Sequence, residues 1–252
     1  MYHPIIGSHI IELEQTASTN TYTDKLLHSE KPPEGTVIIA YQQTQGRGQD
    51  QNVWESEANK NLTFSVILYP EFLNPSEQFK LIKIVSLGIT DFVKGLLSLH
   101  ADLKIKWPND IYWGDNKLCG TLVQNSIVGP HLTECIVGIG LNINQEQFIS
   151  NAPNPISLHQ ISGKNYDVNE CLTKLCTTLD FRYTQLKNKQ YSLLETDYLS
   201  LLYRWLEWHE YIIHDIRMTA RITGITDYGQ LKLESSNGKI HECGMKEVVY
   251  CL

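Results

Sequence analysis

The sequence predicts an α+β fold, in which a mixed, largely antiparallel sheet carries packed helices and a small β-barrel follows at the C-terminus. Three patterns support this prediction. A β-rich apolar run occupies residues 62–68, apolar residues at three- and four-residue spacing fill residues 75–99, and short strands separated by turn residues begin near Ile212. We therefore expect one large domain over residues 1–209 and a small one over residues 210–252.

The composition excludes several classes of protein. The chain has 252 residues, of which 42% are hydrophobic and 19% charged, enough for one sizeable domain and a small one. A net charge of -7 argues against a protein that mainly binds nucleic acid, because phosphate binding needs a basic face. No apolar run is long enough to span a membrane, and the N-terminus carries no secretory signal. The six cysteines contain no Cys-x-x-Cys pair, which favours buried, reduced thiols in a cytoplasmic protein.

The order of the expected elements follows from the same periodicities. Strands are expected at residues 10–13, 35–43, 62–68, 117–128 and 134–144, and in the tail at 213–222, 229–234, 240–243 and 247–250. Helices are expected at residues 18–28, 75–99, 168–187 and 191–208. Gly138 and Gly140, which lie inside an expected strand, indicate a bulge or the close approach of a ligand.

The most informative segment is KWPND, which runs from Lys106 to Asp110. Pro108 favours an extended residue before it and a rigid turn after it. A further turn at residues 114–116 predicts a hairpin whose second strand opens at Lys117. The hairpin would bring two lysines and one aspartate to one cleft, a suitable site for a polyanion whose charge changes during a reaction. Taken alone, the segment is equally compatible with a surface hairpin carrying solvated lysines.

Two other polar segments have both a structural and a functional interpretation. Ser18-Thr19-Asn20 begins an expected helix, and such residues commonly cap a helix, although they could also form a hydrogen-bonding cup for a ligand. A long polar stretch, residues 42–61, contains Gly46-Arg47-Gly48. Its glycines allow the backbone to approach an anion, and Arg47 supplies a planar donor fork, although most such loops are only flexible. Trp54 would cover a purine or anchor this loop in the core.

These segments together resemble the biotin protein ligases, or biotin–[acetyl-CoA-carboxylase] ligases. The resemblance is carried by the GRG loop, the KWPND segment, the Lys117-Leu118-Cys119-Gly120 strand and the Gly138-Ile139-Gly140-Leu141-Asn142 strand. Their order is highly specific, and the resemblance extends from about Glu14 to the C-terminus. It implies a class II synthetase-like catalytic domain and an SH3-like C-terminal domain. Only about fifteen residues precede Ser18, so we expect the monofunctional type, without a DNA-binding domain and without a specific DNA partner.

The resemblance also implies the reaction. Such ligases form biotinyl-5′-AMP from biotin and ATP, with Mg²⁺, and then transfer biotin to a lysine of a biotin carboxyl carrier protein domain. It assigns Ser18-Thr19-Asn20 to the biotin ureido group, whose carbonyl and two N–H groups hydroxyl and amide side chains can match. The residues implied for biotin and nucleotide are Ser18, Thr19, Asn20, Gln43, Gly46, Arg47, Gly48, Gln49, Trp54, Lys117, Gly120 and Asn142. A homodimer is compatible with this assignment, whereas membrane association is not expected, and no metal ligand is assigned.

The first step of that reaction brings two anions together. Like unit charges about 4 Å apart repel by roughly 4 kcal/mol at an effective dielectric near 20. The cations available to offset this repulsion are Lys106, Lys117 and Arg47. We assign Lys117 to the biotin carboxylate and the α-phosphate, and Lys106 to the phosphates. Asp110, the fourth catalytic candidate, would orient the attacking lysine or hold a metal-bound water.

The loop after Gly48 departs from the usual family pattern. Gln49, Asp50, Gln51 and Asn52 stand where further basic residues and a glycine are common. The loop over residues 46–58 is polar and has only Val53 and Trp54 to bury, so we expect it to be mobile without ligand and to close over the adenylate. From the departures we expect it to retain the adenylate less tightly than is usual.

Two alternative functions remain open from the sequence. A lipoate or octanoate transferase shares the fold, but the arginine- and glycine-rich segment ending in His-Asp that it should carry is not found. A non-catalytic regulator that binds biotin or an adenylate is disfavoured by the retention of Lys106 and Lys117.

Overall fold

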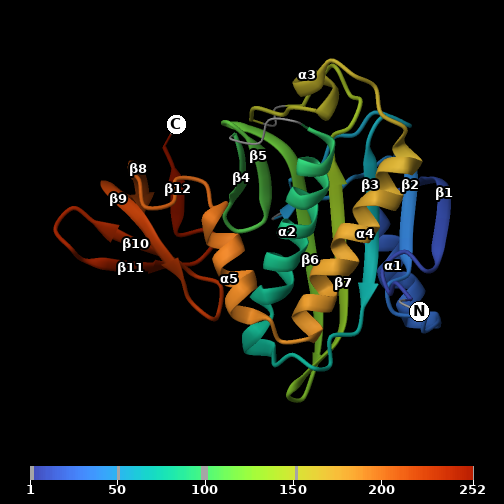
Figure 1. Ribbon diagram of the computed structural model, residues 1–252, viewed down its shortest axis with the longest axis horizontal. Coiled ribbons are helices and arrows are strands. Elements are labelled where there is room, and N and C mark those ends of the chain that lie inside the picture. The colour runs from blue at the N-terminus through green and yellow to red at the C-terminus, as the bar shows by residue number, and fades with distance from the viewer. Residues whose placement is uncertain (1–2, 50–51, 98–101, 151–152, 252) are drawn as a thin grey trace.

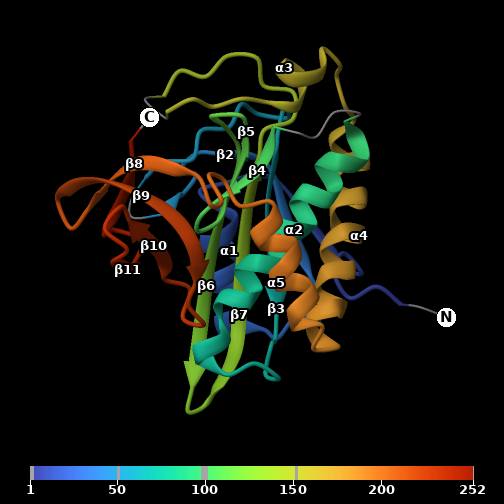
Figure 2. The same ribbon diagram turned by 60° about the vertical axis from the view of Figure 1, so that its left-hand side comes forward.

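The computed structural model describes residues 3–49, 52–97, 102–150 and 153–251, and Figures 1 and 2 show their arrangement. A seven-stranded sheet forms the centre. Its spatial order is β1 (Ile10–Thr16), β2 (Val37–Gln43), β3 (Leu62–Leu68), β7 (His131–Leu141), β6 (Asn116–Val128), β5 (Asp110–Trp113) and β4 (Leu103–Lys106). Of the neighbouring strand pairs in the described part of this sheet, β1–β2 is parallel and the other five are antiparallel. The expected mixed, largely antiparallel sheet is therefore confirmed.

Helices cover both faces of this sheet. α2 (Phe79–Leu96), α4 (Val168–Lys187) and α5 (Tyr191–Ser200) lie on one side, and α1 (Thr19–Ser29) lies on the other (Figure 2). The short α3 (Leu158–Ser162) lies near one end of the sheet (Figure 1). All seven residues of β3 are buried, because its two faces are covered by different helices and its two edges pair with β2 and β7. Continuous apolar runs are typical of strands buried in this way.

Two of the expected helices are shorter in the structure. Residues 75–77 form a separate 3-10 turn before α2, which ends at Leu96, while residues 98 and 99 lie outside the described part of the chain. α5 ends at Ser200, not at Trp208. Beyond it the backbone turns to pair with the edge of β4: the Ile105 amide donates to the Leu201 carbonyl (2.8 Å), and the Tyr203 amide donates to the Ile105 carbonyl (2.9 Å). Satisfying this edge outweighs continuation of the helix.

The C-terminal segment forms a second, five-stranded antiparallel sheet. Its order is β11 (Ile240–Cys243), β10 (Leu231–Ser235), β9 (Ile216–Ile225), β8 (Trp208–Ile213) and β12 (Val248–Tyr250). Among the described residues no pairing joins β11 to β12, so the barrel that we expected is an open sheet. Its strands have an inward apolar face that continues the core of the main sheet. Trp107 links the two sheets, since its indole Nε1 donates to the Gly229 carbonyl at 2.9 Å.

Two compositional expectations can be compared with the structure. All six cysteines are free; five are buried and Cys251 is partly exposed. Within the described ranges, no helix is both long and apolar enough to cross a membrane.

Candidate functional site

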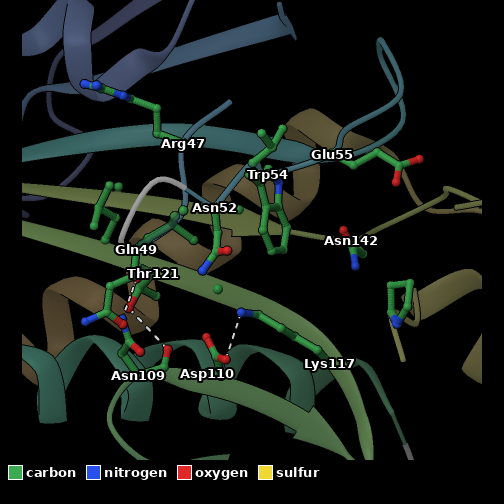
Figure 3. Close-up of a pocket in the computed structure, with 18 of the residues that line it drawn as sticks. Arg47, Gln49, Asn52, Trp54, Glu55, Asn109, Asp110, Lys117, Thr121 and Asn142 are labelled. Atoms are coloured by element: carbon green, nitrogen blue, oxygen red, sulfur yellow. Dashed lines mark hydrogen bonds and ion pairs between the residues drawn. The ribbon is translucent and has the colours of Figure 1, made fainter. Parts of the chain in front are cut away.

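A cavity of about 650 Å³ lies at one end of the main sheet (Figure 3). Ligand pockets typically have volumes of about 300–1,000 Å³. Every residue predicted for the site lines this cavity, with the exception of Gly46. The backbone of Gly46 instead packs on that of Trp54, where a side chain would collide with the Trp54 carbonyl oxygen at 2.4 Å. A glycine is therefore required at position 46 by the tight packing of the loop and not by contact with the cavity.

One end of the cavity is charged. Lys117 Nζ lies 2.8 Å from Asp110 Oδ2, and Figure 3 shows the two side chains facing each other. The strand register explains this, because Lys117 of β6 pairs with Tyr112 of β5 and Asp110 lies two residues from Tyr112 on the same face. A register shift between Ile111 and Tyr112 sets that alignment. The predicted convergence of Asp110 and Lys117 is thus present.

Lys106 lies deeper and is surrounded by aromatic rings. Its Nζ donates to the Tyr112 hydroxyl at 3.1 Å and lies 4.7 Å from the centre of the Tyr112 ring and 5.0 Å from that of Tyr250. Burial lowers the pKa of Lys106; Asp110 raises it, and Lys117 lowers it further. The cleft therefore contains a second ammonium group whose charge is held by rings instead of a close carboxylate.

The other end of the cavity is neutral and densely hydrogen-bonded. Thr19 donates from its amide to Gln43 Oε1 (2.8 Å), and Ser65 Oγ lies 2.8 Å from Thr19 Oγ1 and 2.6 Å from Asn20 Oδ1. Asn20 Nδ2 donates to the Gln124 side-chain carbonyl at 3.0 Å. Ser18 is the N-cap of α1, yet its side chain makes no capping hydrogen bond. Mutual hydrogen bonds thus fix a cup of hydroxyl and amide groups, and capping does not account for these side chains.

Two glycines of β7 form the floor between these ends. Gly138 and Gly140 are in regular register with β3 and β6, so the alternative of a bulge is wrong. A Cβ on Gly138 would lie 2.2 Å from Asn20 Oδ1, and one on Gly140 would lie 2.4 Å from the Trp54 ring. Protein side chains approach both glycines closely, and the indole of Trp54 rests directly on the sheet. Its Nε1 is buried without a hydrogen-bond partner in the described part of the chain.

Asn142, at the end of the glycine strand, carries a second unsatisfied group. Its Nδ2 donates to the Ile156 carbonyl at 3.0 Å. Its Oδ1 is buried, and no partner for it exists among the described residues. A buried acceptor without a partner costs about 1–3 kcal/mol, so a cavity that contains one is suited to a ligand donor.

The polar loop over residues 46–58 folds as a hairpin in its described part. Gly48 donates its amide to the Asn52 carbonyl at 2.7 Å, and Trp54 donates to the Gly46 carbonyl at 3.0 Å. Arg47 is exposed and points away from the Lys117–Asp110 pair (Figure 3). The departures at Asp50 and Gln51 lie outside the described residues.

Glu55 attaches this loop to the segment after β7. Its carboxylate accepts from the backbone amides of Ile149 (2.9 Å) and Ser150 (2.8 Å) and from Gln145 Nε2 (3.2 Å). Burial acts to raise the pKa of Glu55, but these hydrogen bonds outweigh it, so the pKa lies below its ordinary value. One ionised side chain therefore makes several of the links between the two segments that border the cavity, and the Glu57 amide adds another by donating to Gln145 Oε1 at 3.0 Å.

Reasoning from the sequence misses several lining or supporting residues. Ser65 carries a usable signal, since it is a polar residue in a wholly buried apolar strand. Tyr250 carries none, because it lies far along the chain in a different sheet. Asn109 and Thr121 are hydrogen-bonded to each other across β5 and β6, with Asn109 Nδ2 donating to the Thr121 carbonyl (2.5 Å).

Comparisons with known proteins agree with this arrangement. A family model described as "Biotin/lipoate A/B protein ligase family" matches residues 12–142. A bifunctional ligase/repressor of Bacillus spizizenii is 27% identical over 250 residues, covering 93% of this chain and 72% of the relative. A biotin–[acetyl-CoA-carboxylase] ligase of Mycobacterium tuberculosis is 29% identical over 175 residues, covering 69% of this chain and 64% of the relative. The structure of a biotin protein ligase from Aquifex aeolicus in complex with biotin and ATP aligns with a TM-score of 0.79 and 25% identity, over 97% of this chain and 100% of that one.

Proposed function

The chain belongs to the biotin/lipoate A/B protein ligase family, and from this premise we propose that it is an ATP-dependent biotin–protein ligase. It forms biotinyl-5′-AMP from biotin and ATP and then transfers biotin to a lysine of a carrier protein. The observation that carries this proposal is the presence, in one cavity, of a neutral hydrogen-bonding cup at one end and the Lys117–Asp110 pair at the other. A ligand with a polar neutral head and an anionic tail fits this polarity.

The cup suits the ureido group of biotin. Ser18, Thr19, Asn20 and Gln43 offer both hydroxyl and amide groups, which can donate to one carbonyl and accept from two N–H groups. Hydrogen bonds already fix the positions of Gln43, through the Thr19 amide, and of Asn20, through Ser65, so binding requires little additional ordering of these groups. Lipoate has no such group in its ring, so this end of the cavity favours biotin over lipoate.

The charged end suits the joining of two anions. A biotin carboxylate oxygen attacks the α-phosphorus of ATP, and pyrophosphate leaves. Lys117 is placed to balance charge on the carboxylate and the α-phosphate, and Lys106 to balance charge on the phosphates. Arg47 is assigned to an anion of the bound nucleotide, which requires its exposed side chain to turn toward the cavity.

The unsatisfied groups near Asn142 suit the base of the nucleotide. The exocyclic amine of adenine is a donor, and Asn142 Oδ1 is a buried acceptor that needs one. Trp54 lies beside it as a flat surface for the purine, with Gly120 beneath the indole. Gly48 and Gln49 line the same wall and are assigned to the adenylate.

Mg²⁺ is proposed to enter with ATP. In the described residues, no group of three or more His, Cys, Asp or Glu side chains could hold a metal ion. This donor set fits a metal that keeps its waters and binds mainly to substrate phosphates. When bound, Mg²⁺ supplies charge neutralisation on the triphosphate.

The second step needs an acceptor amine. We assign Asp110 to orienting that amine as it attacks the mixed anhydride and AMP leaves. We propose that the acceptor is a lysine of a biotin carboxyl carrier domain and that the ligase forms a homodimer. We also propose a cytoplasmic location, because free cysteines are typical of proteins in a reducing compartment.

The test is transfer of biotin to a carrier. Purified protein, ATP, Mg²⁺, labelled biotin and a carrier domain are expected to yield labelled carrier and pyrophosphate. In a parallel reaction lipoate should release far less pyrophosphate than biotin. Absence of labelled carrier, or an equal response to lipoate, would reject the proposal.

A further inference from the structure

The C-terminal sheet contacts the lysine side chain that lies deepest in the cleft. Tyr250, in the last strand β12, places the centre of its ring 5.0 Å from Lys106 Nζ, and Tyr112 of the main sheet lies 4.7 Å away. Within the described residues Asp110 pairs with Lys117, and Lys106 has no ion-pair partner of its own. The electronegative faces of aromatic rings attract an ammonium group, more strongly where water is excluded.

Tyr250 is itself fixed by its neighbours. Its ring packs edge-on against Tyr211 of β8, with centroids 5.3 Å apart and planes at 67°. The Arg204 guanidinium lies 5.9 Å from the ring and donates to the Cys251 carbonyl at 2.9 Å. The Tyr250 hydroxyl is buried, and no described residue forms a hydrogen bond with it. The ring is therefore the part of this side chain that makes the interactions.

We propose that Tyr250 is a positioning residue, which holds the Lys106 ammonium in place and charged through the face of its ring. The C-terminal sheet thereby takes part in adenylate formation, although it need not touch biotin or ATP. A second contact supports this role, because Trp107, the next residue of the same segment, donates to the Gly229 carbonyl of the C-terminal sheet. Neither contact can be inferred from the KWPND motif alone.

The charge state of Lys106 depends on several elements. The charged or titratable groups that face it, from both sheets and from the turn after α5, are Asp110, Tyr112, Asp115, Lys117, Arg204 and Tyr250. Burial lowers the pKa of Lys106, and Lys117 and Arg204 act in the same direction, while Asp110 and Asp115 oppose them. Loss of the Tyr250 ring should lower this pKa further, because the ring stabilises only the charged form.

The inference rests on the proposed function for its kinetic test, which compares Tyr250→Leu with Tyr250→Phe. The leucine variant is expected to lower kcat/KM for ATP in adenylate formation by about 5- to 30-fold and to move the basic limb of the pH profile to lower pH. The phenylalanine variant keeps the ring and should stay within about twofold of the natural protein. Tyr228→Leu changes a tyrosine that is 73% exposed in the turn between β9 and β10 and should leave the profile unchanged.

A second readout does not require activity. The rate at which an amine-selective acylating reagent labels Lys106, followed by mass spectrometry across a pH series, reports its neutral fraction. Tyr250→Leu should increase labelling of Lys106 at a given pH, with thermal unfolding confirming that the variant is folded. An unchanged labelling profile, or equal effects of the leucine and phenylalanine variants, would overturn the role of the ring. Failure of the natural protein to form adenylate would instead reject the proposed function and leave the labelling result to decide on Tyr250.

Discussion

Lys106 and Lys117 each bring one positive charge to the cleft, but their side chains have different surroundings. Lys117 faces a carboxylate at 2.8 Å and is 30% exposed, so its ammonium can exchange one anionic partner for another. Lys106 is enclosed by rings and a hydroxyl, and its pKa is lowered by burial. We infer that Lys117 exchanges Asp110 for the biotin carboxylate and the α-phosphate during the reaction, whereas Lys106 provides a fixed positive charge for the phosphates.

Replacement of Lys117 by alanine tests this division. Loss of one preorganised charge donor at a reacting centre typically costs about 10²–10³ in rate. Lys117→Ala should therefore reduce adenylate formation by about that factor, measured by pyrophosphate release. Transfer from pre-made biotinyl-5′-AMP should suffer less, and Lys239→Ala, in the turn between β10 and β11, should affect neither step. Equal losses in both steps would contradict the assigned role.

Asn142 allows a test at the level of one atom. If its unsatisfied Oδ1 accepts from the adenine amine, ATP should bind more tightly than purine riboside triphosphate, which lacks that amine. A difference of about 5- to 10-fold corresponds to one net hydrogen bond of roughly 1–1.5 kcal/mol. In Asn142→Ala the two nucleotides should bind equally, while the affinity for biotin stays unchanged. Isothermal titration with both nucleotides measures this, and a preference for ATP that persists in the variant would refute the contact.

Sequence reasoning is most successful for residues whose role is set by local geometry. Lys106, Asp110 and Lys117 are predictable because two successive hairpins, β4–β5 and β5–β6, bring them together. Ser65 stands out as a polar residue in a buried strand, but its contact with Thr19 is not predictable, because strand pairing creates it. The contact of Tyr250 with Lys106 is not predictable either, because the docking of a second sheet brings the two residues together from distant parts of the chain. Physical proximity of this kind depends on tertiary packing, which no local pattern encodes.

At the scale of elements, Glu55 makes three of the hydrogen bonds that join the two segments bordering the cavity. Its carboxylate accepts from two consecutive backbone amides, Ile149 and Ser150, in the segment after β7. The pKa of Glu55 lies below its ordinary value of 4.5 because these hydrogen bonds favour the ionised form. This contribution is therefore present above that ordinary value and is lost as the pH falls through the lower folded value.

Hydrogen exchange can measure this connection. Glu55→Gln should increase exchange of the Ile149 and Ser150 amides at neutral pH, since an amide oxygen is a weaker acceptor than a carboxylate. Glu57→Gln removes the same charge from the same loop and should leave them unchanged. Biotin plus ATP should protect residues 46–49 and 52–58 in the natural protein, because the adenylate gives Arg47 and Trp54 a partner. Equal protection with and without ligand would contradict closure of this loop.

The limits of the helices show why element boundaries are harder to predict than their existence. The apolar pattern after Tyr191 continues past Ser200, yet the helix ends there. Arg204 and Leu206 adopt positive φ values of 59° and 61°, which an α-helix does not allow. The backbone leaves the helix because the free edge of β4 offers hydrogen bonds at Ile105. The competing partner lies nearly a hundred residues away and leaves no trace in the local sequence.

At the scale of the whole molecule, the two sheets share one core and one site. The predicted boundary between residues 209 and 210 falls inside β8 (Trp208–Ile213), the first strand of the C-terminal sheet, and the buried apolar residues of both sheets belong to one continuous cluster. A tail of this size is too small to be very stable alone. We therefore expect the C-terminal sheet to unfold together with the main domain.

Trp107 provides the test of this expectation. Its indole is 4% exposed and donates to the buried Gly229 carbonyl, so Trp107→Phe leaves that carbonyl without its partner. The expected loss in the free energy of unfolding is about 1–3 kcal/mol. Trp208→Phe, at a tryptophan of the C-terminal sheet that is 47% exposed, should change it by no more than about 0.5 kcal/mol. Urea denaturation followed by circular dichroism and by adenylate formation should give one coincident transition for both variants. Two separated transitions in the natural protein would show that the C-terminal sheet is an independent domain, and its contacts with Lys106 and Trp107 would then be too weak to support the site.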